Sequence, residues 1–264
     1  MENVDISRKK IIVADLDGTL AESKIKVDRE MGEIINSLLK HVDFAVISGG
    51  SYKQLLKQFV EGIELDRDAV SRLYILPTSG SEMYRFADGA WEAVYSEKLS
   101  GSEKKRIFDA FMTVEKEGLY VRPDKTYGVV IEDRDTQITL SGVGQDAPME
   151  EKAMWDPDAK KRIRIKERLD TLLPEFEVRM GGKSSVDVTR KGIDKAYGIR
   201  KINERLGYGI EDMIFIGDAL FEGGNDYPVK KCGVYCISVS SVTESKSILR
   251  GFLQNLCRPR KSLP

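Results

Sequence analysis

The chain has 264 residues, of which 41% are hydrophobic, so it is long enough to build a sizeable core in one or two domains. Lysine and arginine total 42 against 43 acidic residues, which gives a formal net charge of -1. This balance excludes a global basic field, so we expect neither a nucleic-acid partner nor a membrane partner.

The apolar runs, the cysteines and the single histidine limit the cellular compartment and the catalytic chemistry that the sequence allows. No apolar run approaches the roughly 18 residues of a membrane span, and the N-terminus lacks the apolar block of a secretion signal, so we expect a cytoplasmic protein. The three cysteines have no metal-ligand spacing, which is typical of reduced thiols. Because His41 is the only histidine, acid–base chemistry must come from carboxylates or lysines.

The chain opens with β-α pairs. Apolar runs at residues 11–14 and 44–47 predict buried strands, and each is followed by apolar residues at helical spacing. A third strand at 74–76 is stopped by Pro77. Near-continuous apolar strands joined through helices predict a parallel sheet that is covered on both faces.

After Pro77 the pattern becomes antiparallel, because Asp88-Gly89 between two alternating segments predicts a hairpin. The elements expected next are a helix near 102–117, strands near 128–132 and 137–141, a polar loop, a helix opened by Asp156-Pro157 and running to Leu173, and a strand at 176–180.

Alternation of strands and helices returns in the last third, with strands at 213–216 and 234–237 and a final helix. We therefore expect an α/β protein whose Rossmann-like parallel-sheet core is made from both ends of the chain. The predicted core is residues 1–87 and 188–264, and the predicted inserted α+β domain is residues 88–187.

The segment Asp15-Leu16-Asp17-Gly18-Thr19 follows the first predicted strand, at the sheet edge where ligands gather in open α/β folds. Two carboxylates two residues apart repel each other, and a bound cation relieves that repulsion. A small set of hard oxygen ligands favours Mg²⁺. The structural alternative is an acidic turn that ends at a glycine.

Three other segments strengthen the functional interpretation. Ser48 and the glycines after it offer a hydroxyl and N–H groups for phosphoryl oxygens at a helix N-terminus. Asp218 ends a late strand, and Asp226 adds another acid nearby. Lys195 begins a helix, where the helix dipole disfavours a cation unless that cation faces an anion. Each segment alone is common in solvated turns, but the four segments in this order are a specific signal of a functional site.

This order of motifs resembles the haloacid-dehalogenase superfamily over nearly the whole chain. The resemblance implies a Mg²⁺-dependent phosphotransferase with Asp15 as nucleophile and Asp17 as general acid/base. It also implies that Ser48 and Lys195 hold the transferring phosphoryl group. The metal ligands that it implies are Asp15, Asp17 through its backbone carbonyl, Asp218 and Asp226.

The inserted segment resembles the type II caps of subfamily IIB, and the sequence is most similar to the eukaryotic-type phosphomannomutase branch. Arg134 resembles a phosphate-gripping cap arginine, and Ser185 and Asp187 resemble positions on a sugar-contacting strand. The structural alternative is an exposed arginine and a polar strand edge. The substrate-binding residues implied are Thr19, Lys24, Gly49, Arg134, Ser185 and Asp187.

The sequence departs from that branch at two positions, because Tyr127 and Lys24 stand where the branch has arginines. A mutase must hold a bisphosphorylated sugar in two orientations, so we expect the loss of these cations to weaken mutase activity more than hydrolysis. We therefore expect a phosphatase of a small phosphorylated metabolite such as a hexose phosphate. Phosphomannomutase activity is the alternative, and a non-catalytic sugar-phosphate sensor is the alternative from another class. A homodimer is left open as a further partner.

Overall fold

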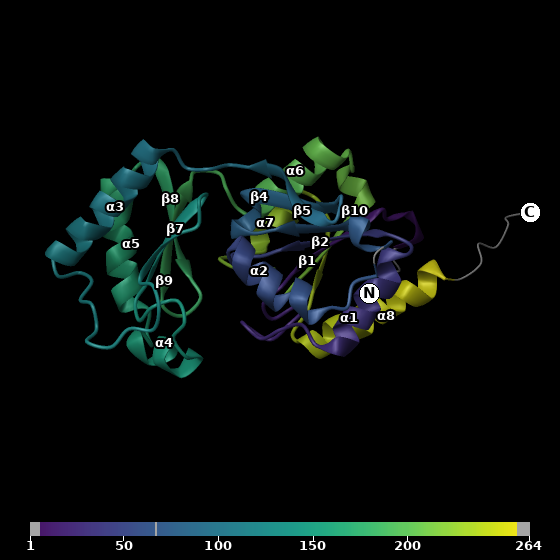
Figure 1. The fold of residues 1–264 in the computed structure, drawn as a ribbon, viewed down its shortest axis with the longest axis horizontal. Coiled ribbons are helices and arrows are strands. Elements are labelled where there is room, and N and C mark those ends of the chain that lie inside the picture. The colour runs from purple at the N-terminus through teal and green to yellow at the C-terminus, as the bar shows by residue number, and fades with distance from the viewer. Residues whose placement is uncertain (1–5, 67, 258–264) are drawn as a thin grey trace, which may run out of the picture. The chain divides into compact units, whose positions relative to one another are not determined.

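The computed structural model describes residues 6–66 and 68–257, and the chain divides into two compact units (Figure 1). The core unit combines Met1–Ser96 with Asp194–Pro264, and the cap unit is Glu97–Ile193. The second unit is thus inserted into the first. An α/β core with an inserted α+β domain was predicted from the sequence, and that fold class is confirmed.

The core unit is built on a seven-stranded sheet in the order β11-β10-β1-β2-β3-β4-β5. Its strands are β1 (Ile11–Asp15), β2 (Asp43–Ile47), β3 (Leu73–Leu76), β4 (Glu82–Ala87), β5 (Ala90–Ser96), β10 (Met213–Gly217) and β11 (Tyr235–Ser238). The strands from β11 to β3 run parallel, and β4 and β5 extend the sheet antiparallel. The carboxyl ends of the parallel strands therefore share one edge, where ligands gather in such sheets.

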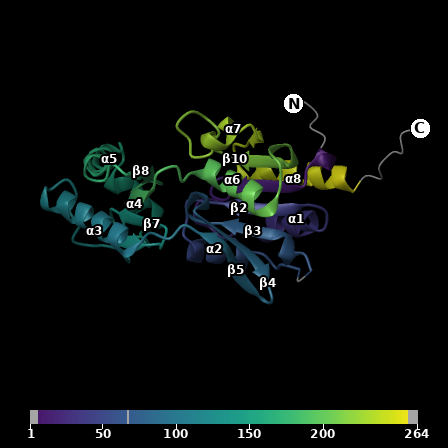
Figure 2. The same cartoon turned by 90° about the horizontal axis from the view of Figure 1, so that it is seen from above.

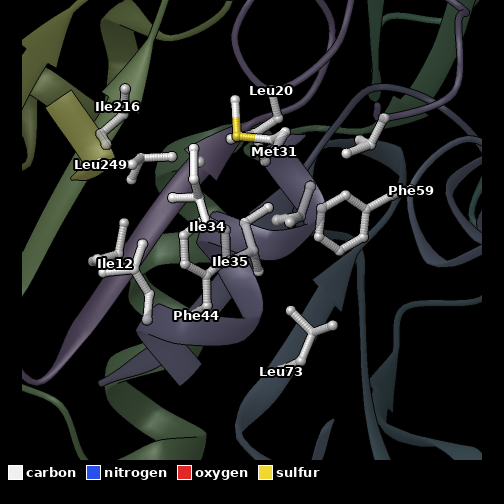
Figure 3. Close-up of a cluster of buried hydrophobic side chains, with 14 of the residues drawn as sticks. Ile12, Leu20, Met31, Ile34, Ile35, Phe44, Phe59, Leu73, Ile216 and Leu249 are labelled. Carbon is white, nitrogen blue, oxygen red and sulfur yellow. The ribbon is translucent and has the colours of Figure 1, made fainter. Parts of the chain in front are cut away.

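Helices cover both faces of this sheet, and Figure 2 shows α6 and α7 across the sheet from α2. The helices of the core unit are α1 (Arg29–Leu39), α2 (Tyr52–Gln58), α6 (Lys195–Leu206), α7 (Tyr227–Lys231) and α8 (Val242–Leu256). On one face Ile12 packs in a cluster with Ile34 and Leu249 (Figure 3), and on the other Val13 packs in a cluster with Ile199. Because successive strand residues point to opposite faces, this double burial explains the continuous apolar runs.

The cap unit has a four-stranded antiparallel sheet in the order β6-β7-β9-β8. Its elements are α3 (Gly101–Lys116), β6 (Ile131–Asp133), β7 (Gln137–Ser141), α4 (Met149–Trp155), α5 (Lys160–Leu172), β8 (Phe176–Gly181) and β9 (Ser185–Arg190). Phe111 of α3 and Ile165 of α5 pack on one face of the sheet in a cluster with Val188. The other face carries polar side chains, because the alternate positions of β7 and β9 are Gln, Thr, Ser and Asp.

The division of the chain falls at different residues from the predicted boundaries of 88 and 187. The β4–β5 hairpin pairs with β3, so it belongs to the core sheet and the core continues to Ser96. At the other end β9 pairs with β8 along its whole length and with β7 from Ser185 to Thr189, so the cap unit continues to Ile193. The Asp88-Gly89 turn was predicted, and both of its residues have positive φ as hairpin turns require.

Two local predictions in the cap unit need correction. The segment expected to be a polar loop contains the helix α4. This helix was not predicted, because its acidic first turn made the segment look like a polar loop. The helix expected to open at Asp156-Pro157 begins at Lys160, after Ala159 in a left-handed conformation. Asp156 still caps this helix, because its carboxylate accepts from the backbone N–H groups of Lys161 and Arg162. Within residues 6–66 and 68–257, no helix is long and apolar enough to cross a bilayer.

Candidate active site

Asp15 is the last residue of β1, at the carboxyl edge of the parallel sheet. It pairs in register with Ile47 of β2, and only 4% of its surface is exposed. Its Oδ1 lies 2.5 Å from Lys195 Nζ. A buried carboxylate is costly unless it is paired, and this ammonium supplies the pairing.

Lys195 is the first residue of α6, directly after the N-cap Asp194, whose side chain accepts from Tyr197 N. The lysine is 1% exposed, and its Nζ also lies 2.5 Å from Asp226 Oδ1. A cation at a helix N-terminus was expected to face an anion, and here it faces two. Burial disfavours the ammonium, but Asp15 and Asp226 outweigh burial and raise the pKa of Lys195.

Asp218 and Asp226 come from the loop that follows β10. Asp226 is fully buried, and its Oδ2 accepts from Ala219 N at 3.0 Å. Asp218 is exposed and lies against Gly18, where an added Cβ would come within 2.4 Å of Asp218 Oδ2. Gly18 has a φ of +85°, so the turn after Asp17 requires glycine both for its backbone conformation and for the space that Asp218 occupies.

Asp15, Asp218 and Asp226 form a group that fits a divalent cation. Each offers a carboxylate oxygen, and these oxygens all lie within 4.8 Å of one another. Burial raises the pKa of Asp15 to about 7; Lys195 opposes that rise, and Asp226 and Asp218 add to it. Burial and Asp226 also raise the pKa of Asp218. Three carboxylates against one ammonium leave excess negative charge that a hard cation would neutralise.

The Asp17 carboxylate is not part of this group and has a different set of contacts. Its Oδ1 accepts from the backbone N of Lys24 at 2.8 Å and from Nε2 of Gln58 at 2.9 Å. Lys24 itself is exposed, and its φ of +61° allows its N–H to turn back toward Asp17. Gln58 was not singled out from the sequence, because a glutamine 41 residues away at the end of a helix carries no recognisable signal.

Thr19, Ser48 and Gly49 occupy the loops beside this cluster. Ser48 follows β2, is 2% exposed, and accepts from Gly50 N on its Oγ at 3.0 Å. Thr19 is fully buried, and no described residue bonds to its Oγ1. An added Cβ at Gly49 would meet only Ser79 Oγ, at 3.9 Å, so there is room for a side chain at this position.

Arg134, Ser185 and Asp187 belong to the cap unit. Ser185 and Asp187 lie on β9 opposite Ser141 and Thr139 of β7, and both form hydroxyl hydrogen bonds with those partners. All four side chains share the polar face of the cap sheet. Arg134 lies in the turn after β6, and its Nε donates to Glu132 Oε2 at 2.6 Å.

The haloacid dehalogenase-like hydrolase family matches residues 12–229, and the chain belongs to that family. The phosphomannomutase of Encephalitozoon cuniculi is 30% identical over 84% of each chain, and that of Spinacia oleracea is 30% identical over 85% of this chain and 88% of its own. A solved IMP-nucleotidase of Plasmodium falciparum shares the fold at a TM-score of 0.68 and 17% identity, covering 96% of this chain and 72% of the nucleotidase. Within its family the chain is therefore similar to phosphomannomutases.

Proposed function

We propose that this protein is a Mg²⁺-dependent phosphotransferase of hexose phosphates, that it forms a phosphoryl-Asp15 intermediate, and that its overall reaction is that of a phosphomannomutase. The observation that carries the proposal is the buried Asp15–Lys195–Asp226 cluster, with Asp218 beside it, at the carboxyl edge of the sheet. The similarity to phosphomannomutases supports the mutase reaction over the hydrolysis expected from the sequence.

Asp15 would act as the nucleophile, because it ends β1 and its carboxylate lies both in the acidic group and against Lys195. Lys195 holds Asp15 in one orientation and offsets negative charge as the phosphoryl group arrives. Mg²⁺, held by Asp15, Asp218 and Asp226, would neutralise the phosphoryl oxygens when bound. Ser48, with the N–H groups of the loop after it, would bind the same oxygens.

Asp17 would act as the general acid and then as the general base. It lies two residues beyond Asp15, where its carboxyl group can protonate the departing oxygen as the bond from that oxygen to phosphorus breaks. The same carboxylate then takes a proton from the hydroxyl that receives the phosphoryl group. Thr19 and Lys24 follow these two aspartates in the loop after β1, Gly49 lies in the loop after β2, and we assign all three to the binding of the group that carries the phosphate.

The polar face of the cap sheet would recognise the sugar. Ser185 and Asp187 offer a hydroxyl and a carboxylate that suit sugar hydroxyl groups. Arg134 would bind a second phosphate, and a guanidinium suits that task because it donates two parallel hydrogen bonds. A mutase needs such a contact, because its intermediate carries two phosphates.

Hydrolysis is the second candidate, and one observation favours it. The guanidinium of Arg134 is already engaged by Glu132, so binding a second phosphate must compete with a salt bridge whose Arg134 side chain is only 8% exposed. A protein without that contact would release inorganic phosphate instead of returning it to the sugar. A non-catalytic sensor is disfavoured, because such a protein has no need for a buried lysine between two aspartates.

The test is to incubate the purified protein with mannose 1-phosphate and Mg²⁺, with and without glucose 1,6-bisphosphate. A mutase forms mannose 6-phosphate only with the bisphosphate, a phosphatase releases inorganic phosphate in both cases, and a sensor does neither. Asp15→Asn should abolish turnover, because an amide is a poor nucleophile toward phosphorus. Asp109→Asn, an exposed position on α3, is the matched control and should leave turnover unchanged. Residual turnover by folded Asp15→Asn would refute the covalent mechanism.

A further inference from the structure

Gln58 makes a buried contact with Asp17 that the proposed mechanism does not use. It is the last residue of α2, is 4% exposed, and donates from Nε2 to Asp17 Oδ1. The backbone N–H of Lys24 donates to the same oxygen, so two donors converge on Oδ1. Among the described residues none donates to Asp17 Oδ2. One carboxylate oxygen is therefore held in place, and the other is left for a ligand.

Gln58 also holds the segment that follows Asp17 at a second point. Its backbone carbonyl accepts from Val27 N at 2.9 Å, near the end of the loop between β1 and α1. One residue thus binds that loop through its side chain at Asp17 and through its backbone at Val27. The other end of α2 begins at the N-cap Ser51, three residues after Ser48. The helix therefore connects the proposed phosphoryl-binding loop to Asp17.

Packing alone does not account for an amide at this position. The Oε1 of Gln58 is buried, and no described residue donates to it. A buried carbonyl without a donor is costly, and an apolar side chain of similar size would avoid that cost. The opposite amide orientation would set Oε1 against Asp17 Oδ1, which places two acceptors together, so the donor faces the carboxylate.

We propose that Gln58 is a positioning residue, an inference that rests on the proposed function. Gln58 orients the Asp17 carboxylate so that its Oδ2 exchanges the proton with the substrate. In the first step Asp15 forms a bond to phosphorus, the bond from phosphorus to the leaving oxygen breaks, and the proton on Asp17 Oδ2 moves to that oxygen. In the second step the oxygen of the accepting hydroxyl bonds to phosphorus, the bond from phosphorus to Asp15 breaks and restores the Asp15 carboxylate, and Oδ2 of Asp17 takes the proton of that hydroxyl. Gln58 touches no reacting atom and acts only through Asp17.

The experiment compares Gln58→Leu with wild type on a hexose phosphate and on p-nitrophenyl phosphate, whose leaving group needs little protonation. On the hexose phosphate, kcat should fall about 10-fold to 100-fold with KM nearly unchanged, which is part of the roughly 10²- to 10⁴-fold that a positioned acid/base contributes. On p-nitrophenyl phosphate the loss should stay below about 3-fold. Gln58→Glu keeps the size of the side chain, removes the donor, and should show the same selectivity.

Two comparisons make the result specific to Asp17. In an Asp17→Asn background, Gln58→Leu should cause no further loss on the hexose phosphate, because the group that it positions is gone. Leu56→Ala, on the same helix and packed against the core, is the control for a loosened helix and should lower both activities by one factor. Equal losses on the two substrates, or a further loss in the Asp17→Asn background, would overturn the Gln58 inference. Full activity of Asp15→Asn would instead refute the proposed function and the role of Gln58 with it.

Discussion

Replacing Lys195 with methionine should destabilise the protein strongly. The change keeps the length of the side chain and removes an ammonium that lies 2.5 Å from both Asp15 Oδ1 and Asp226 Oδ1. Both carboxylates are at most 4% exposed, so the variant leaves two like charges buried without their partner. Breaking a buried pair in this way costs about 3–5 kcal/mol, which is a large share of the roughly 5–15 kcal/mol that a domain has.

The loss should depend on pH in a direction set by Asp15. Its pKa is about 7 in the folded protein against an ordinary value of 3.8. Between about pH 4 and pH 7 the folded state therefore holds this proton more tightly than the unfolded chain, and the contribution of Asp15 to stability decreases as pH rises through that window. Without Lys195 the pKa of Asp15 rises further. The variant should therefore lose more stability at pH 8 than at pH 5.

Urea unfolding of wild type and variant at both pH values, in a chelator, measures these differences. Lys105→Met on α3 is the control, because Lys105 pairs with Asp109 and the two side chains are 75% and 63% exposed. Such a surface pair contributes at most about 1 kcal/mol. If Lys195→Met costs no more than the control, or costs more at pH 5 than at pH 8, the account of the buried cluster is wrong.

Four other outcomes follow from the site. Adding Mg²⁺ at about 100 times its dissociation constant should raise the free energy of unfolding by about 2.7 kcal/mol, and an unchanged melting temperature in a Mg²⁺ titration would contradict the metal site. Gly18→Ala should lose about 1–2 kcal/mol to its left-handed backbone and should weaken Mg²⁺ binding in calorimetry by displacing Asp218; unchanged affinity would show that the contact is irrelevant. Arg134→Ala should lower kcat/KM for a hexose bisphosphate roughly 10-fold to 150-fold and spare a small monophosphate, and an equal loss on both would exclude a distal-phosphate role. Glu132→Gln should lower KM for the same bisphosphate by freeing Arg134, which steady-state kinetics would detect.

Most of the core sheet was predictable because its strands are buried on both faces. The apolar runs that became β1, β2 and β10 are buried at every position, and the helix after β1 has a periodic apolar face. The boundary between the core and the cap was harder to predict from the sequence. A hairpin turn at Asp88-Gly89 shows that two strands pair with each other, but not to which sheet the pair belongs, and β4 proved to join β3.

The candidate site, like the fold, was predictable from the sequence only in part. Asp15, Asp218 and Asp226 were predicted to meet because each lies at or after the end of a strand in one parallel sheet, and their oxygens do lie together. Their catalytic roles stay predictions. Arg134 shows the limit of motif reasoning, because a residue type suited to phosphate binding can also bind its own neighbour, as it does with Glu132.

The sequence by itself determined the alternation of strands and helices in the core, the presence of an inserted cap, and which carboxylates and lysine gather at one sheet edge, because these depend on periodicity and on where parallel strands end. Tertiary structure alone decided what each side chain faces. Lys195 could have bound only one acid, and Gln58 could have turned to solvent. Their contacts depend on the rotation of α6 and α2 against the sheet, which is set by the packing of residues far apart in the chain.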